Sequence, residues 1–168
     1  MKIPNTYTNI NETDCCALPN ITDWDKKVVT FDNQKFIRMY TKSFLYVPLN
    51  MSKIMTALQK TADDAQATMA PTEALILSRD ISPWKAEQLY AVSKSVEGAD
   101  NITLDGTFVT KVYEGPYKNA GKWVKDLHAY AKELQKKVDK TYLFYTTCPK
   151  CAKHYGKNYV IVMGHSAN

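Results

Sequence analysis

The feature that most constrains this chain is the run from Gly106 to Leu127, GTFVTKVYEGPYKNAGKWVKDL, because its layout occurs a second time earlier in the sequence. Branched and aromatic residues in its first half favour an extended strand, and the pair Gly115-Pro116 ends that strand. Apolar residues then recur at spacings of three and four, as in a helix with one buried face. They are Ala120, Trp123, Val124, Leu127, Tyr130, Ala131, Leu134 and Val138.

The earlier copy begins with residues 36–50, FIRMYTKSFLYVPLN, and continues with a second helical stripe of six apolar residues. Advancing this stripe by about 69 positions places all six residues on the later stripe. The same shift superposes two later strand-like runs, 73–78 and 90–92, on 142–147 and 159–161. We therefore predict two copies of strand, helix, strand, strand. The alternative is that two unrelated helices share their spacing, because every helix repeats near 3.6 residues. The six residues are Met51, Ile54, Met55, Leu58, Ala62 and Ala65.

The predicted fold is α+β, with duplicated β-α-β-β units that form one antiparallel sheet with two helices on one face. An irregular N-terminal arm, held in place by Trp24, precedes them. Residues 1–168 form a single domain in this prediction. An arm and a hairpin strand occupy 1–33, the first repeat 34–97, a short seam 98–101 and the second repeat 102–165. The hairpin is predicted because Asp32-Asn33-Gln34, between two strand-like runs, supplies turn chemistry.

Composition excludes several classes of function. With 45% hydrophobic and 23% charged residues, the 168-residue chain is globular. Its net charge of +5 comes from lysine, since Arg38 and Arg79 are the only arginines. Base readout and phosphate clamps rely on arginine, so no nucleic-acid partner is expected. No apolar run approaches a membrane span, and the N-terminus lacks the hydrophobic segment of a signal peptide. We expect a cytoplasmic protein with no membrane partner. The sequence leaves the oligomeric state open.

The sharpest local motif is Cys148-Pro149-Lys150-Cys151, whose two thiols can face one centre from a single turn. This pair is half of a metal site. Cys15 and Cys16, or His154, would have to complete it, which would bring the arm to the C-terminal region; zinc is the metal expected for such ligands.

Two other interpretations of the cysteines remain open. A strand, Cys-Pro-Lys-Cys and a helical turn resemble the redox site of thioredoxin-like enzymes, although Gly156 and the strand near Tyr159 leave little room for the helix that such a site needs. Reduced cysteines in a cytosolic protein can also simply pack as small hydrophobic residues.

Aromatic residues are the second signal, because tyrosine and tryptophan supply flat apolar area together with one polar contact. Most of them will belong to the core. We predict that several line a ligand cleft between the two halves: Trp84, Tyr113, Tyr117, Trp123 and Tyr145. Glu73 and Glu114 are the candidate catalytic carboxylates, since a glutamate in an apolar cleft can act as a general base. No Ser-His-Asp spacing, phosphate-binding glycine loop or dinucleotide motif is present.

Two resemblances follow from these motifs. The duplicated plan, with a strand running into KVYEGPYKNAGKW, resembles the GyrI-like small-molecule-binding superfamily, whose repeats form one antiparallel sheet around a ligand cleft. Nearly the whole chain is also similar to a bacterial family usually labelled only "hydrolase". The second resemblance rests on DCCALP, ITDWD, FLYVPLN, SRDISPW, GTFVTKVYEGPY and YTTCPKCAKHYGKNYV.

The resemblances imply two functions. As a binding module, the protein would hold an apolar or cationic small molecule against the aromatic residues. As a hydrolase, it would need a carboxylate or a metal-bound hydroxide near a small electrophilic substrate. Many GyrI-like proteins carry a cleft-facing glutamate on the strand after the second helix, but residues 141–147 of this chain contain no carboxylate. We therefore expect binding ahead of catalysis. The similarity to the hydrolase-labelled family includes both cysteine pairs and implies that they meet.

Overall fold

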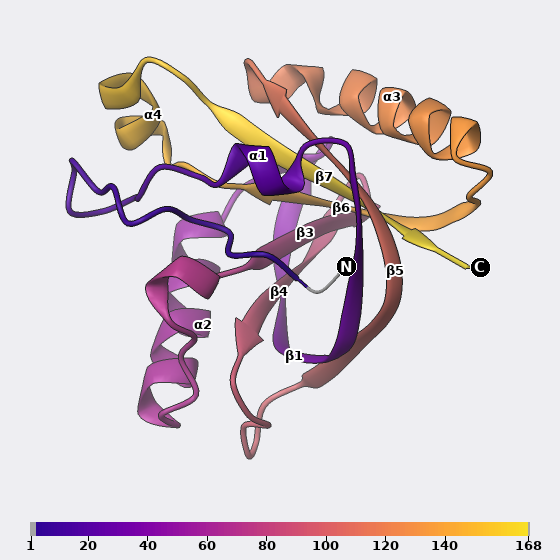
Figure 1. Ribbon diagram of the computed structural model, residues 1–168. Coiled ribbons are helices and arrows are strands. Elements are labelled where there is room, and N and C mark those ends of the chain that lie inside the picture. The colour runs from indigo at the N-terminus through magenta and orange to yellow at the C-terminus, as the bar shows by residue number, and fades with distance from the viewer. Residues whose placement is uncertain (1–2, 168) are drawn as a thin grey trace. The chain divides into compact units, whose positions relative to one another are not determined.

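The computed structural model describes residues 3–167, and the chain has the predicted α+β fold with antiparallel strands (Figure 1). It forms two compact units. Unit 1 contains the chain up to Asp32, the segment Pro71–Glu73, and the chain from Gly106 onward. Unit 2 contains the intervening segments, Asn33–Ala70 and Ala74–Asp105. The division falls within the two longest strands, β1 (Lys27–Phe44) and β5 (Asn101–Glu114).

Unit 2 contains four strands in the order β2-β1-β4-β3, and all of their neighbouring pairs are antiparallel. Helix α2 packs on this sheet as the apolar stripe predicts: Leu58 and Ala62 are buried against Ile37 and Val92. Removing such side chains from water is the main force that holds the helix in place. The elements are β2 (Val47–Pro48), α2 (Met51–Asp64), β3 (Ile76–Ser82) and β4 (Lys85–Val92).

Unit 1 contains β6, β7 and most of β5, which pair antiparallel in the order β6-β7-β5, together with the beginning of β1, and α3 packs on one face of these three strands (Figure 1). Trp123 and Leu127 of α3 are buried against Val160 and Val162 of β7. A Cβ at Gly164 would lie 2.9 Å from Val138 and 3.2 Å from Leu127, so glycine allows the helix to approach the sheet closely. The elements are α3 (Ala120–Glu133), β6 (Val138–Tyr145) and β7 (Tyr159–Ser166).

The N-terminal arm is ordered although it has little regular structure. The backbone N–H of Thr6 donates to the carbonyl of Thr72 at 2.8 Å, and the buried indole of Trp24 donates to the carbonyl of Asn5 at 3.0 Å. Hydrogen bonds therefore replace the missing helix or sheet pairing. The predicted contribution of Trp24 is confirmed. Short elements complete the unit: α1 (Ile21–Trp24), η1 (Pro71–Glu73), η2 (Tyr117–Asn119) and α4 (Pro149–Tyr155).

The hairpin predicted at Asp32-Asn33-Gln34 is wrong, because β1 runs through these residues without reversing direction. Asn33 adopts a left-handed φ of 51°, which asparagine tolerates better than most residues, and its N–H donates to the carboxylate of Asp105 at 2.5 Å. The turn chemistry of these residues therefore appears only as the left-handed conformation of Asn33, and the strand continues. Val138 also lies outside the predicted helix, since α3 ends at Glu133 and Val138 begins β6.

The two units share an order of elements, strand, helix, strand, strand, and in each unit the first strand pairs with the last. Helix α3 begins 69 positions after α2 and has the same length of 14 residues. The later strands do not keep this offset, since β6 begins 62 positions after β3 and β7 begins 74 after β4. Among residues 3–167, no helix is long and apolar enough to cross a membrane.

Candidate functional site

Four cysteines come together in unit 1, as the sequence predicts. Cys148 directly precedes α4 and Cys151 lies in its first turn, whereas Cys15 and Cys16 belong to the N-terminal arm. The Sγ atom of Cys15 lies 3.7 Å from that of Cys16 and 3.9 Å from that of Cys148. All four Sγ atoms lie within 4.8 Å of one another, and all four residues are free cysteines. This cluster, called the thiol cluster below, can hold a metal ion.

Groups that the sequence analysis missed surround the thiol cluster. The Thr13 hydroxyl lies 3.3 Å from Cys151 Sγ, and the Cys148 N–H donates to Cys16 Sγ at 3.5 Å. Tyr155 donates its hydroxyl hydrogen to the Cys16 carbonyl at 2.8 Å. His154, the alternative fourth ligand, instead lies 3.3 Å from a carboxylate oxygen of Glu12. No spacing in the sequence links Thr13 to residues more than one hundred positions away, so only the fold reveals this surrounding.

The thiols of the cluster differ in acidity. Burial raises the pKa of Cys16, whereas the hydrogen bond with Thr13 lowers the pKa of the fully buried Cys151. A hydrogen bond that involves Cys151 raises the pKa of Cys15. Because hydrogen bonds to a thiolate favour its charged form, the contact with the Thr13 hydroxyl favours the thiolate of Cys151.

Four of the five predicted ligand contacts form two ring pairs in unit 1. Tyr113 stacks on Trp123 with ring centroids 5.8 Å apart, and Tyr117 meets Tyr145 edge to face at 4.9 Å. Tyr113 and Tyr145 both pair with Val160 of the central strand, so they lie in one row on the face that α3 covers. Trp123 is 7% exposed and Tyr117 is 39% exposed, so this aromatic group extends from the core to the surface.

The hydroxyl groups of this aromatic group have fixed partners. Tyr113 donates to a carboxylate oxygen of Asp126 at 2.6 Å, and Tyr117 donates to the carbonyl of Thr147 at 3.0 Å. Burial, and for Tyr113 also the contact with Asp126, raises the pKa of both phenols. Both rings are therefore neutral and oriented at physiological pH. Since Thr147 directly precedes Cys148, the Tyr117 hydrogen bond also links the aromatic group to the thiol cluster.

The remaining predicted site residues occupy other elements. Trp84 lies in unit 2, in the turn between β3 and β4, where it is 55% exposed and its ring lies 5.7 Å from that of Phe44. Glu73 lies in η1 and not in the strand predicted for it, and Glu114 is the last residue of β5. Both glutamates are exposed. Their catalytic role and the binding role of Trp84 remain predictions.

A buried ion network in unit 2 was also missed. Glu87 is 3% exposed, and its carboxylate oxygens lie 2.7 Å from Arg79 Nε and 3.4 Å from Arg38. Arg38 also donates to Asp100 at 2.9 Å. The sequence signal was that the chain has only these two arginines. That both of them contact Glu87 is seen only in the fold. With two guanidinium partners, Glu87 is suited to hold the sheet together and not to abstract a proton.

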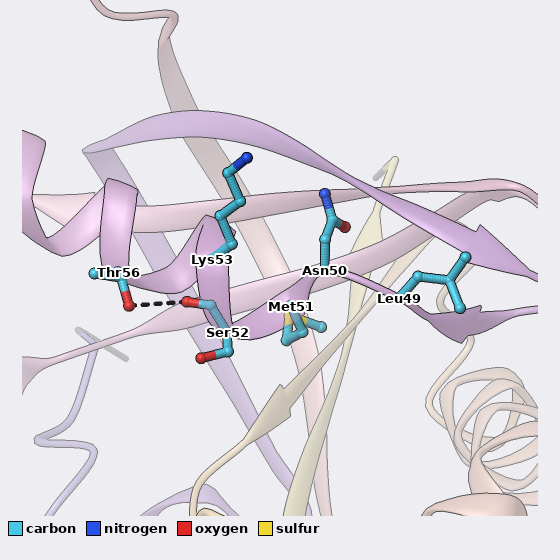
Figure 2. Close-up of a pocket in the computed structure, with 6 residues that line it drawn as sticks. All are labelled: Leu49, Asn50, Met51, Ser52, Lys53 and Thr56. Carbon is cyan, nitrogen blue, oxygen red and sulfur yellow. Dashed lines mark hydrogen bonds between the residues drawn. The ribbon is translucent and has the colours of Figure 1, made fainter.

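A hollow of about 610 Å³ lies at the beginning of α2 in unit 2. Figure 2 shows that its lining comes from one short segment and includes no predicted site residue. Lys53 is its one titratable side chain, and Thr56 donates to the carbonyl of Ser52 at 2.9 Å within the helix. Because acid and base groups do not converge there, we assign no chemistry to this hollow. Its lining is Leu49, Asn50, Met51, Ser52, Lys53 and Thr56.

Solved structures with similar folds were found for most of the chain. A conserved protein from Listeria innocua, titled as uncharacterized, has 11% identity and a TM-score of 0.63, covering 86% of this chain and 94% of its own. A protein titled as a hydrolase from the same organism has 10% identity and a TM-score of 0.62, covering 86% and 93%. SAV2435, solved bound to tetraphenylphosphonium, has 12% identity and a TM-score of 0.50, covering 84% and 93%. At these identities the similarity concerns the fold.

Sequence comparison assigns a family. Among curated proteins, no sequence matches this chain significantly. Residues 6–166 match the family described as Bacterial hydrolase, which is most of the chain. The protein belongs to this family.

Proposed function

We propose that this member of the Bacterial hydrolase family is a small-molecule-binding protein, and that the aromatic group of unit 1 forms the surface that holds the ligand. One observation carries the proposal: two oriented ring pairs share one face of the sheet, and one of them reaches the surface at Tyr117. Flat rings with fixed hydroxyls bind apolar molecules with little loss of conformational freedom. Trp84, an exposed indole of unit 2, is not part of this surface, and its role in ligand binding stays a prediction.

The ligand class follows from the chemistry of the rings. Aromatic faces carry negative charge density and attract cations, most strongly where water is excluded. A compact organic cation with apolar substituents therefore suits the aromatic group better than an anion does. SAV2435, which has a similar fold, was solved with tetraphenylphosphonium, a molecule of this class. A GyrI-like relationship and a duplicated origin of the two units belong to the same proposal, and the shared strand order supports them.

Calorimetric titration with tetraphenylphosphonium tests the proposal. We expect saturable binding to the wild type, and Tyr117→Ala should weaken it about five- to tenfold, since one cation–π contact contributes roughly 1 kcal/mol. Tyr46→Ala is the matched control, because it removes a tyrosine that is 57% exposed in unit 2. Triphenylphosphine oxide, which is uncharged, separates the contribution of charge from that of apolar area. Absence of saturable binding, or equal losses in the two variants, would exclude the aromatic group as the ligand surface.

The alternative function is a hydrolase that acts on a small electrophilic substrate, and the family description is the observation that favours it. Glu114 or Glu73 would then act as the general base. A metal-bound hydroxide is a weaker route, because a zinc ion held by all four thiols would have no open position for water. An ester panel assayed with wild type, Glu114→Gln and Glu73→Gln decides between the two functions. Turnover that either substitution abolishes would establish hydrolysis, and ligand binding without turnover would support the binding protein.

A further inference from the structure

We propose that Cys15, Cys16, Cys148 and Cys151 bind one zinc ion as four thiolate ligands. A tetrahedral site with zinc–sulfur bonds of about 2.3 Å has sulfur–sulfur edges of about 3.8 Å. The two separations of 3.7 and 3.9 Å match this edge, and the limit of 4.8 Å on every other pair leaves room for a single ion. A cluster of several iron atoms would need its ligands further apart.

The other interpretations of the cysteines explain less of the geometry. Packing as small hydrophobic residues accounts for the buried Cys151 but not for the exposed Cys15, which still faces the same centre. A disulfide needs sulfur atoms about 2.05 Å apart and joins two residues at a time. Here all four sulfurs surround one point. Thiolate ligands arranged in this way favour zinc among the common metals.

The surroundings of the cluster are suited to thiolates. When zinc replaces the protons of four thiols, the four protons go to the solvent and the site keeps a charge of −2. The N–H of Cys148 donates to Cys16 Sγ, and the Thr13 hydroxyl is placed to donate to Cys151. Such neighbouring donors usually accompany metal ligands and orient them.

A zinc ion at this position would join two segments of unit 1 that are far apart in the sequence. Cys15 and Cys148 are 133 residues apart in the sequence, and the ion would tie the N-terminal arm to α4 (Figure 1). The arm has little regular structure of its own, so a metal link that closes a long loop would contribute strongly to its order. Four thiolate ligands make the ion structural, because none of its positions is open to a substrate.

Metal analysis of the full-length protein tests the proposal directly. Protein purified under reducing conditions without chelator should contain one zinc per chain by mass spectrometry. Cobalt added to metal-free protein should produce the intense visible absorption of a tetrahedral cobalt–thiolate centre, and this signal should saturate at one equivalent. Cys148→Ser should lose both signals. Zinc at much less than one equivalent together with no cobalt absorption would overturn the proposal, as would iron at one equivalent in its place.

Two controls separate metal binding from folding. Thr8→Ala removes the hydrogen bond from the Thr8 hydroxyl to the Leu18 carbonyl at 2.9 Å in the arm but touches no sulfur, so it should keep the zinc. A chelator added to the wild type should release the zinc and expose the arm to proteolysis. Loss of zinc in Thr8→Ala, or an arm equally protected with and without the metal, would contradict the structural role. Tetraphenylphosphonium binding can succeed or fail independently of all these measurements.

Discussion

At the scale of single residues, the cost of burying charge decides what Glu87 does. A lone carboxylate out of water would be strongly unfavourable, and Arg38 and Arg79 supply the opposite charge together with hydrogen bonds. Arg38 is in turn shared with Asp100, which is about half exposed. Arg38 therefore has one buried and one exposed carboxylate partner. The contributions of these two ion pairs to stability can be compared within one protein.

We predict that Glu87→Gln destabilises the protein by about 3 kcal/mol, because both arginines lose the charge that compensates their partial burial. Asp100→Asn, which removes the exposed partner of Arg38, should cost less than about 1 kcal/mol. Urea unfolding of the two variants and the wild type measures both values. Equal costs would mean that burial does not govern this network.

The phenols of the aromatic group show a second residue-scale effect. Tyr113 and Tyr117 are positioned by hydrogen bonds to Asp126 and to the Thr147 carbonyl. Each hydroxyl is satisfied within the protein, so a ligand can contact the exposed part of Tyr117 without leaving a polar group unpaired. For this reason the proposed ligand contacts are expected to depend on ring faces and not on hydroxyl groups.

At the scale of elements, α3 is held to its sheet by a narrow apolar stripe. Leu127 is fully buried at the centre of the core cluster of unit 1, while Lys125, two residues earlier, is exposed. Gly164 on β7 leaves space into which the Leu127 side chain fits. The helix therefore depends on a few well-packed side chains, as expected for an amphipathic helix of 14 residues.

We expect Leu127→Ala to cost roughly 2 to 5 kcal/mol, because it removes buried methyl groups and leaves a cavity under the helix. Lys125→Ala on the same helix should change stability by less than about 0.5 kcal/mol. Thermal unfolding followed by circular dichroism distinguishes the two variants. A cost below about 1 kcal/mol for Leu127→Ala would show that α3 is not held by this stripe.

At the scale of the whole molecule, surface ion pairs make stability depend on pH. Hydrogen bonds from Lys111 and His165 lower the pKa of Asp126 and of Asp139 below the ordinary value of 3.8. A carboxylate whose pKa is lowered in the folded state stabilises the protein at pH values above the pKa that it has in the unfolded chain. This contribution is lost as the pH falls through the pKa of the folded state. Both side chains are about half exposed, so each contribution is at most about 1 kcal/mol.

Stability should therefore fall as the pH decreases from about 4 toward 2, and Asp126→Asn combined with Asp139→Asn should make this decrease shallower. Melting temperatures of the wild type and the double variant between pH 2 and pH 7 provide the measurement. If the melting temperature of the double variant falls with decreasing pH as steeply as that of the wild type, these two ion pairs do not cause the loss of stability in acid.

The sequence by itself determined the two long helices, and it showed that the Cys148 and Cys151 pair needs further ligands. The spacing of apolar residues predicted α2 and α3, because burial on one face of a helix requires a repeat near 3.6 residues. The half-site Cys148 and Cys151 predicted that Cys15 or Cys16 would lie nearby, which the structure confirms. The cysteines could be predicted because two thiols at this spacing lack two of the four ligands of a tetrahedral site.

Only the tertiary structure decided how locally ambiguous residues are used. Asp32-Asn33-Gln34 has the chemistry of a turn, yet β1 continues through it and pairs with β4 from Lys35 onward, since ladder hydrogen bonds outweigh one residue's preference. Glu87 is held by two guanidinium groups because the strand register places Arg79 opposite it and Arg38 nearby. Contacts between residues far apart in the chain carry no local signal, because they arise from packing and not from spacing along the sequence.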